Sequence, residues 1–222
     1  MKLFKYLLLS ILILVGIGML VVSMTINSTV KNVIEQHGTR ITGTVVSVDR
    51  VSISPFTGRG EVNGFKVTNP DGYRDPYAFT TDSFSLQISL RTLLSDEIII
   101  HEVFIRNPSV FVEQKLPDNN LYIILRNIQI EAAIEESDKE MIIEYFNMSG
   151  ATATLYTEIG VERTVTIDVE EIELRDIGRG GGREAAEEVV QKIAEEIVHT
   201  ILQDAVRTGG GELRDTIRGL FD

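Results

Sequence analysis

Histidines and carboxylates are the residues of this chain best suited to metal or acid–base chemistry. The three histidines are isolated in the sequence: His37, His101 and His199. None has the neighbouring histidine or carboxylate spacing that is typical of a metal site. The acidic pairs Asp96-Glu97 and Glu135-Glu136 stand in a chain rich in carboxylates, which disfavours a dedicated acid–base role for either. We therefore expect no metal site and no catalytic carboxylate pair.

The glycine-rich run that begins at Gly178 has the composition of a phosphate-binding loop but lacks its pattern. Arg183 stands where a dinucleotide-binding fingerprint needs its last glycine, and no Gly-Lys-Ser/Thr follows. The chain also has no cysteine and no Gly-x-Ser-x-Gly element, so neither nucleophile motif is present. We expect no enzyme and no cofactor, and interpret the run as a flexible joint of four glycines: Gly178, Gly180, Gly181 and Gly182.

The apolar run from Leu7 to Met24 predicts a membrane location. It carries no charge, and as a helix it would be about 27 Å long, close to the thickness of a bilayer core. Lys2 and Lys5 precede it, so the positive-inside bias places the N-terminus in the cytoplasm. The sequence predicts a transmembrane anchor within residues 1–25, with a cleaved signal peptide as the alternative.

The net charge of −12 narrows the range of partners. A strongly acidic chain does not neutralise a phosphate backbone, so nucleic-acid binding is not expected. The absence of cysteine fits an exported bacterial protein that needs no disulfides. The residues after the anchor suffice for one domain with a real core, or for two small domains.

The rest of the pattern predicts an α+β, mainly β fold. A short helix over 27–36, stopped at Gly38, is expected. A helix capped by Asp118 is expected over 121–128, with a strand as the alternative. A change of phase between Val169 and Ile172 predicts a bulge near Glu170. The segments rich in Val, Ile and Thr or alternating in polarity are predicted strands: 41–54, 62–68, 83–90, 98–100, 103–105, 110–112, 141–145, 151–156 and 165–174.

The clearest alternation runs over residues 83–90, where small polar and large apolar side chains take turns. With the next strand it predicts one apolar sheet face: Phe84, Leu86, Ile88, Leu90, Ile98 and Ile100. Such a face either stays open to an apolar ligand or is closed as a core. A long amphipathic helix over 184–207 is the candidate to close it, through a stripe that includes Val190, Ile193, Ile197 and Ile201.

Three segments together resemble the bacterial AsmA-like family. They are Gly60–Asp71 (GEVNGFKVTNPD), Phe79–Gln114 (FTTDSFSLQISLRTLLSDEIIIHEVFIRNPSVFVEQ) and Leu174–Gly182 (LRDIGRGGG). The order of alternating strand, Leu-Leu-Ser break, strand and Asn-Pro turn is similar to the N-terminal unit of that family, and the length is that of a short, single-unit member. The resemblance spans most of residues 26–207, and its motifs are structural and loose.

The resemblance implies a curled, mostly antiparallel half-barrel over residues 26–177 in the periplasm, followed by the joint, helix and tail over 178–222. It also implies a single-pass protein of the bacterial inner membrane that handles phospholipid or maintains the envelope. One copy is too short to bridge a periplasm, so self-association or another inner-membrane protein is an expected partner. A non-catalytic assembly subunit is the alternative function, and a desiccation-type β-sandwich is a third.

Overall fold

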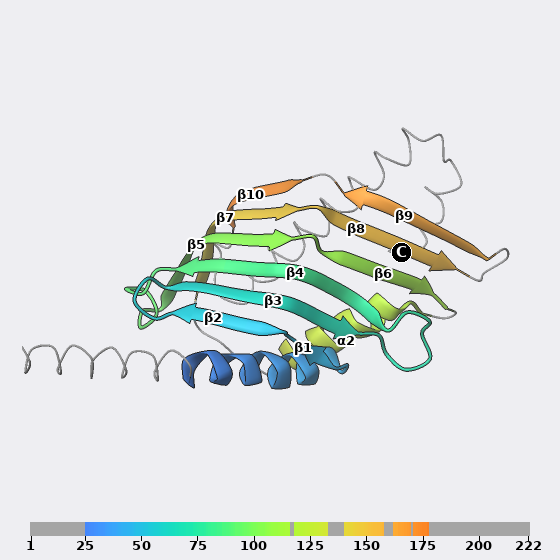
Figure 1. The fold of residues 1–222 in the computed structure, drawn as a ribbon, viewed down its shortest axis with the longest axis horizontal. Coiled ribbons are helices and arrows are strands. Elements are labelled where there is room, and N and C mark those ends of the chain that lie inside the picture. Colours follow the sequence, from blue (N-terminus) through green and yellow to red (C-terminus); the bar gives the residue numbers. More distant parts are fainter. Residues whose placement is uncertain (1–24, 116–117, 133–139, 158–161, 170, 178–222) are drawn as a thin grey trace, which may run out of the picture.

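The computed structural model describes residues 25–115, 118–132, 140–157, 162–169 and 171–177. This part is mainly β, with a ten-stranded, curled and unclosed sheet and two helices (Figure 1). The strands are β1 (Val46–Ser47), β2 (Arg50–Ser54), β3 (Arg59–Thr68), β4 (Tyr77–Ile88), β5 (Glu97–Arg106), β6 (Ser109–Gln114), β7 (Glu140–Ser149), β8 (Ala151–Thr157), β9 (Arg163–Val169) and β10 (Ile172–Ile177). The helices are α2 (Asn120–Ala132) and the N-terminal helix, described over 25–42. The prediction of a mainly β fold is confirmed.

Most strand pairs are antiparallel, as the sequence predicts. β2, β3 and β4 pair in succession, and β4 pairs on its other side with both β5 and β6. The chain then passes through α2, so that β7 lies parallel to β5 and β8 parallel to β6. β9 and β10 complete the sheet as antiparallel partners of β8 and β7.

A crease crosses the sheet at one level, where neighbouring strands carry inserted residues. The registers place Gly64 beside Asp82, Asp82 beside Asn107, and Asn107 beside Gly150. Gly64, Asn107 and Gly150 have φ values of 63°, 50° and 67°, a region that glycine and asparagine adopt most readily. Asn107 binds both neighbouring strands, since its side-chain amide donates to Asp82 Oδ2 on β4 (2.7 Å) and its backbone N–H donates to Ser149 O on β7 (2.8 Å). The crease bends the sheet and keeps the apolar side chains on one face.

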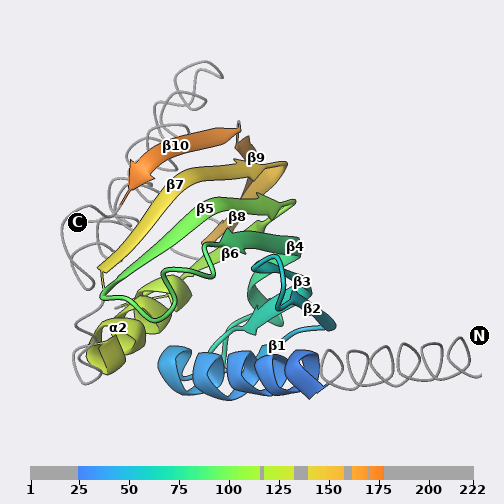
Figure 2. The same cartoon turned by 90° about the vertical axis from the view of Figure 1, so that its left-hand side faces the viewer.

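Both helices pack on the same face of the sheet, which curls around them (Figure 2). Val30 and Ile34 of the N-terminal helix contact a cluster that contains Val51 and Val62. The apolar side of α2 contributes to a second cluster, formed by Leu121, Ile124, Ile128, Val46, Val67, Phe65, Phe79, Ala78 and Ile34. We call this the inner face and the opposite one the outer face.

The N-terminal helix also satisfies the outermost backbone groups of the sheet. Four polar residues spaced by four positions lie on the side that faces β1 and β2: Asn27, Lys31, Glu35 and Thr39. The N–H groups of Ile53, Val48 and Val46 donate to Asn27 Oδ1 (2.8 Å), Glu35 Oε1 (3.0 Å) and Thr39 Oγ1 (2.9 Å), respectively. Lys31 donates to Val48 O and pairs with Glu35. These contacts, which we call the edge ladder, cover an edge of the sheet that would otherwise be free to pair with another strand.

Several element boundaries differ from the prediction. The N-terminal helix continues through Gly38 to residue 42 and ends before Gly43 (φ 69°), so the expected strand over 41–45 is wrong. The edge ladder and the packing of Ile34 outweigh the β propensity of these residues. Asn119, rather than Asp118, caps α2, because its Oδ1 accepts the Tyr122 N–H at 2.8 Å.

The phase change near Glu170 marks a change of strand partner. β9 pairs with β8 and β10 with β7, so the two sides of Glu170 belong to different strands, and Glu170 itself lies outside the described residues. Within the described ranges, no helix has the length and apolarity to cross a bilayer. The predicted anchor, the glycine joint at 178–182 and the helix over 184–207 lie outside those ranges.

Candidate functional site

β4 brings three of the predicted face residues together on the inner face. Phe84, Leu86 and Ile88 alternate with Ser83, Ser85 and Gln87, which lie on the outer face. Each of the three is partly exposed and packs against the largest apolar cluster. The alternation that is visible in the sequence therefore produces an apolar stripe along β4.

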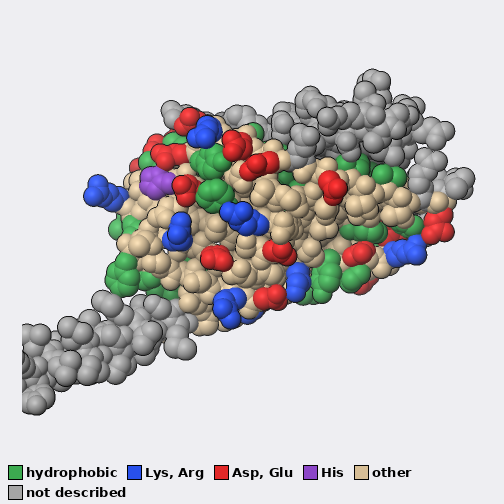
Figure 3. Space-filling model, turned by 45° about the horizontal axis from the view of Figure 1, so that its top comes forward, with side chains coloured by type: hydrophobic (Ala, Val, Ile, Leu, Met, Phe, Trp, Pro, Cys, Tyr) green, Lys and Arg blue, Asp and Glu red, His purple; other side chains and the backbone are tan. Residues whose placement is uncertain are grey.

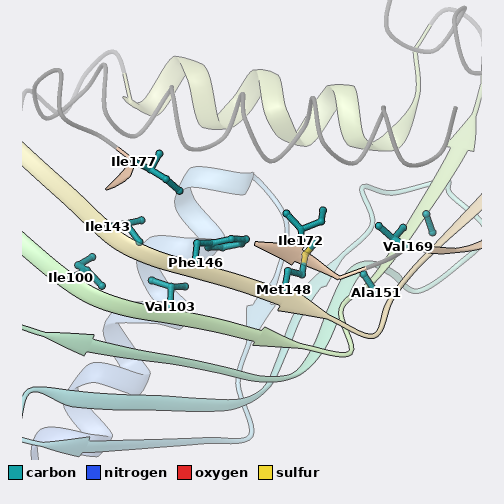
Figure 4. Packing of buried hydrophobic residues seen from close by; sticks show 10 residues of the cluster. Ile100, Val103, Ile143, Phe146, Met148, Ala151, Val169, Ile172 and Ile177 are labelled. Atoms are coloured by element: carbon teal, nitrogen blue, oxygen red, sulfur yellow. The ribbon is translucent and has the colours of Figure 1, made fainter. Parts of the chain in front are cut away.

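The stripe continues sideways across the neighbouring strands. In register, Phe84 pairs with Ile105, Leu86 with Val103 and Ile88 with Ile100. The same rows then reach Met148, Phe146 and Ile143 on β7 and Ile172, Leu174 and Ile177 on β10. Figure 4 shows side chains of β5, β7 and β10 projecting toward the side on which α2 lies. Five of the six predicted face residues thus share one surface: Phe84, Leu86, Ile88, Ile98 and Ile100.

A second irregularity keeps the rows aligned. In β5, β7 and β10 the inward residues are spaced by three positions at one level, from Ile100 to Val103, from Ile143 to Phe146, and from Ile177 to Leu174. Without the extra residue in each strand, half of every strand would turn its apolar side chains outward. Asp176, with φ 53°, lies at this level in β10.

Exposure changes across the inner face. Phe146, Ile172 and Ile177 on β7 and β10 are at most 3% exposed, whereas Phe84, Leu86 and Ile88 on β4 are only partly buried. Leu90 differs from the prediction, because β4 ends at Ile88 and Leu90 lies in the following loop, 39% exposed. The stripe on β4 is therefore less buried than these three residues of β7 and β10.

The outer face is polar and carries a small aromatic cluster. Acidic and basic side chains are interspersed over this side (Figure 3). Phe104 and Tyr145 meet edge to face with centroids 5.7 Å apart, and the Arg175 guanidinium lies 4.6 Å from the Tyr145 centroid. The Tyr145 hydroxyl donates to Glu173 at 2.9 Å, and this hydrogen bond raises the pKa of Tyr145. A face of this composition suits water or a polar protein surface.

A buried polar cluster at the far end of β6 was not predicted. Glu113 is 1% exposed, its Oε2 accepts the Arg74 N–H at 2.6 Å, and its Oε1 lies 3.0 Å from Lys115 Nζ. Lys115 also donates to Gly72 O and lies over the Tyr73 ring, where burial raises the pKa of Tyr73. These contacts hold the loop over 69–76 against β6.

Asn120 completes this cluster, because its side-chain amide binds backbone groups of β6 as a neighbouring strand would. It is fully buried; its Oδ1 accepts the Glu113 N–H (2.8 Å), and its Nδ2 donates to Phe111 O (2.7 Å) and Asn69 Oδ1 (2.6 Å). β4 pairs with β6 only at Ser109 and Val110, so the Asn120 amide supplies partners for backbone groups that β4 does not reach. The Asn120 amide therefore has a structural role in this cluster.

The two histidines that the structure describes, His37 and His101, lie on the surface. His37 Nδ1 is 2.9 Å from an Arg40 guanidinium nitrogen, and His101 Nδ1 is 2.7 Å from Glu144 Oε2. His199 lies outside the described residues. The side chains of the candidate lid residues Val190, Ile193, Ile197 and Ile201 and the joint glycines are likewise outside them.

The fold and its two faces define a class of protein: a mainly β domain with a curled, unclosed sheet that is apolar inside and polar outside. Comparisons with models of known protein families and with curated proteins found no match for this chain. The resemblance to the AsmA-like family therefore stays a prediction.

Proposed function

We propose that this chain is a membrane-anchored, periplasmic protein of AsmA-like type that handles phospholipid, with acyl chains contacting the inner face of its sheet. The apolar stripe on β4 is the observation that carries the proposal. Phe84, Leu86 and Ile88 form a continuous row that stays partly exposed in a sheet that does not close. Partly exposed rows of large apolar side chains are costly in water and favour an apolar ligand.

Two features of the sequence support the same function. The uncharged run from Leu7 to Met24 supplies a membrane anchor. The charge of −12 disfavours anionic polymers as cargo, whereas acyl chains need no charge complement. The inner face therefore offers the apolar contact area that an acyl chain requires.

Photo-crosslinking on β4 tests this function. A benzophenone amino acid is placed at Leu86, on the inner face, or at the adjacent Ser85, on the outer face, in the full chain within bacterial membranes. Phospholipid adducts, detected by mass spectrometry after irradiation, are expected at position 86 and not at position 85. A folded chain that gives no lipid adduct at position 84, 86 or 88 refutes the proposal.

The outer aromatic cluster favours a second candidate function, that of an accessory subunit of an inner-membrane complex. Tyrosine and arginine are enriched at protein interfaces, and Phe104, Tyr145 and Arg175 lie together on the outer face. A subunit of this kind co-purifies with protein partners in fixed ratio. For such a subunit, the amount of bound partner falls in an Arg175→Glu chain and is unchanged in a Leu86→Arg chain that still folds. For a lipid carrier, the amount of bound phospholipid falls in the Leu86→Arg chain and is unchanged in the Arg175→Glu chain.

A further inference from the structure

Two loops at one end of the sheet present exposed apolar side chains to the surroundings. The loop over 55–58 joins β2 to β3, and the loop over 89–96 joins β4 to β5. They are adjacent, because the Ile88 N–H donates to Gly58 O at 2.8 Å and Gln87 Nε2 donates to Thr57 O at 2.5 Å. Leu94 is 97% exposed, Phe56 67%, and Leu90 and Leu93 each 39%. We call these four residues the loop tips.

The loop over 89–96 is built to hold its leucines outward. Thr92 Oγ1 donates to Ser89 O (2.9 Å) and accepts the Ile99 N–H (3.0 Å), while Ser95 Oγ lies 2.6 Å from Glu97 O. These bonds satisfy the polar groups within the loop. The loop over 55–58 and the segment 92–95 of the second loop contain no charged residue, whereas Arg91 and Asp96 flank that segment. Large apolar side chains held on a polar frame favour contact with an apolar partner.

The position of the first turn of the N-terminal helix identifies that partner. Asn27 Oδ1 accepts the Ile53 N–H at 2.8 Å, so the first turn of the N-terminal helix lies beside the end of β2, next to the loop over 55–58. Figure 1 shows the start of this helix and both loops toward the same end of the molecule. The sequence immediately before Thr25 is the uncharged run from Leu7 to Met24.

We infer that the loop tips insert into the surface of the bilayer that holds the segment Leu7–Met24. This inference rests on the membrane anchor of the proposed function and adds a second contact to it. The loop tips and the anchor together hold the sheet in one orientation on the membrane. Leu90 is a tip residue that follows Ile88, the last residue of the β4 stripe, by two positions, so the inner face begins close to the bilayer surface.

Single-cysteine labelling tests this contact, since the chain has no cysteine of its own. The variants Leu94→Cys and Phe56→Cys carry an environment-sensitive NBD dye in the full chain, reconstituted into phosphatidylcholine vesicles. Asp71→Cys is the matched control, because Asp71 is an exposed loop residue beyond the other end of β3. Lipids with a doxyl quencher near the headgroup report dye that touches the bilayer.

The expected result is that doxyl lipid quenches the dye at positions 94 and 56 at least about twofold more than the dye at position 71. Equal quenching at the three positions, in chains that float with the vesicles, overturns the inference while leaving the anchor intact. Chains that do not float with vesicles overturn both the anchor and the inference. A blue shift at position 94 without doxyl quenching means that protein covers the tips, which also overturns it.

Discussion

Replacing Gly150 by alanine measures how strongly the crease is held. At φ 67°, a Cβ on residue 150 would lie 2.2 Å from Asn107 Oδ1. The left-handed conformation costs a residue with a Cβ about 1 kcal/mol. The displaced Asn107 amide loses its 2.7 Å hydrogen bond to Asp82, which adds about 1.5 kcal/mol. The free energy of unfolding is therefore expected to fall by about 2.5 kcal/mol.

Gly72→Ala is the matched control, since Gly72 has φ 90° and a Cβ there would meet nothing within 4 Å. It carries only the backbone cost, about 1 kcal/mol. Urea unfolding of the full chain in mild detergent, followed by circular dichroism, gives both values. Asn107→Gly removes the obstructing side chain, so Gly150→Ala should cost only the backbone term in that background. Equal losses for Gly150→Ala and Gly72→Ala, or additive losses in the double variant, would refute the steric explanation.

Three further predictions concern the polar contacts. Asn120→Ala leaves buried backbone groups of β6 without partners and should lower the free energy of unfolding by about 3 kcal/mol. Asn119→Ala removes only a helix cap and should lower it by about 1 kcal/mol. The urea midpoints of the two variants test this difference. The Val48 N–H holds the pKa of Glu35 below its ordinary value of 4.5. Its carboxylate thus stabilises the fold above that pH and loses this effect as the pH falls through the lower folded-state value, so Glu35→Gln should reduce the acid sensitivity of the urea midpoint. Arg74 lowers the pKa of Glu162 through a 3.0 Å hydrogen bond, and Arg74→Ala should raise that pKa in a carbon-detected NMR titration; an unchanged value would contradict the contact.

The strands that follow a simple period were predictable from the sequence. Phe84, Leu86 and Ile88 alternate with polar residues over the second half of β4, and a period of two is a direct consequence of the pleat. The helix at 121–128 was predictable for the same reason with a period near 3.6. Local periodicity identified the stripe on β4 because all of its residues are close in sequence.

Features that depend on distant residues were not predictable in this way. Asn107-Pro108 reads as a turn, yet the chain passes through it from β5 into β6 with only a bend, because Gly150 and Asp82 flank it in the sheet. Leu90 follows the alternation but lies beyond the end of β4. Glu113 reads as a surface acid, yet it is buried and accepts a hydrogen bond from the loop over 69–76, which is distant in sequence.

The edge ladder has a consequence for how this architecture can change in length over evolution. A strand inserted before β2 would have to displace Asn27, Lys31, Glu35 and Thr39 from their backbone partners together. Strands appended beyond β9 and β10 meet no such ladder among the residues that the structure describes. Lengthening the sheet at its β2 edge would therefore require the loss of all four of these side-chain contacts.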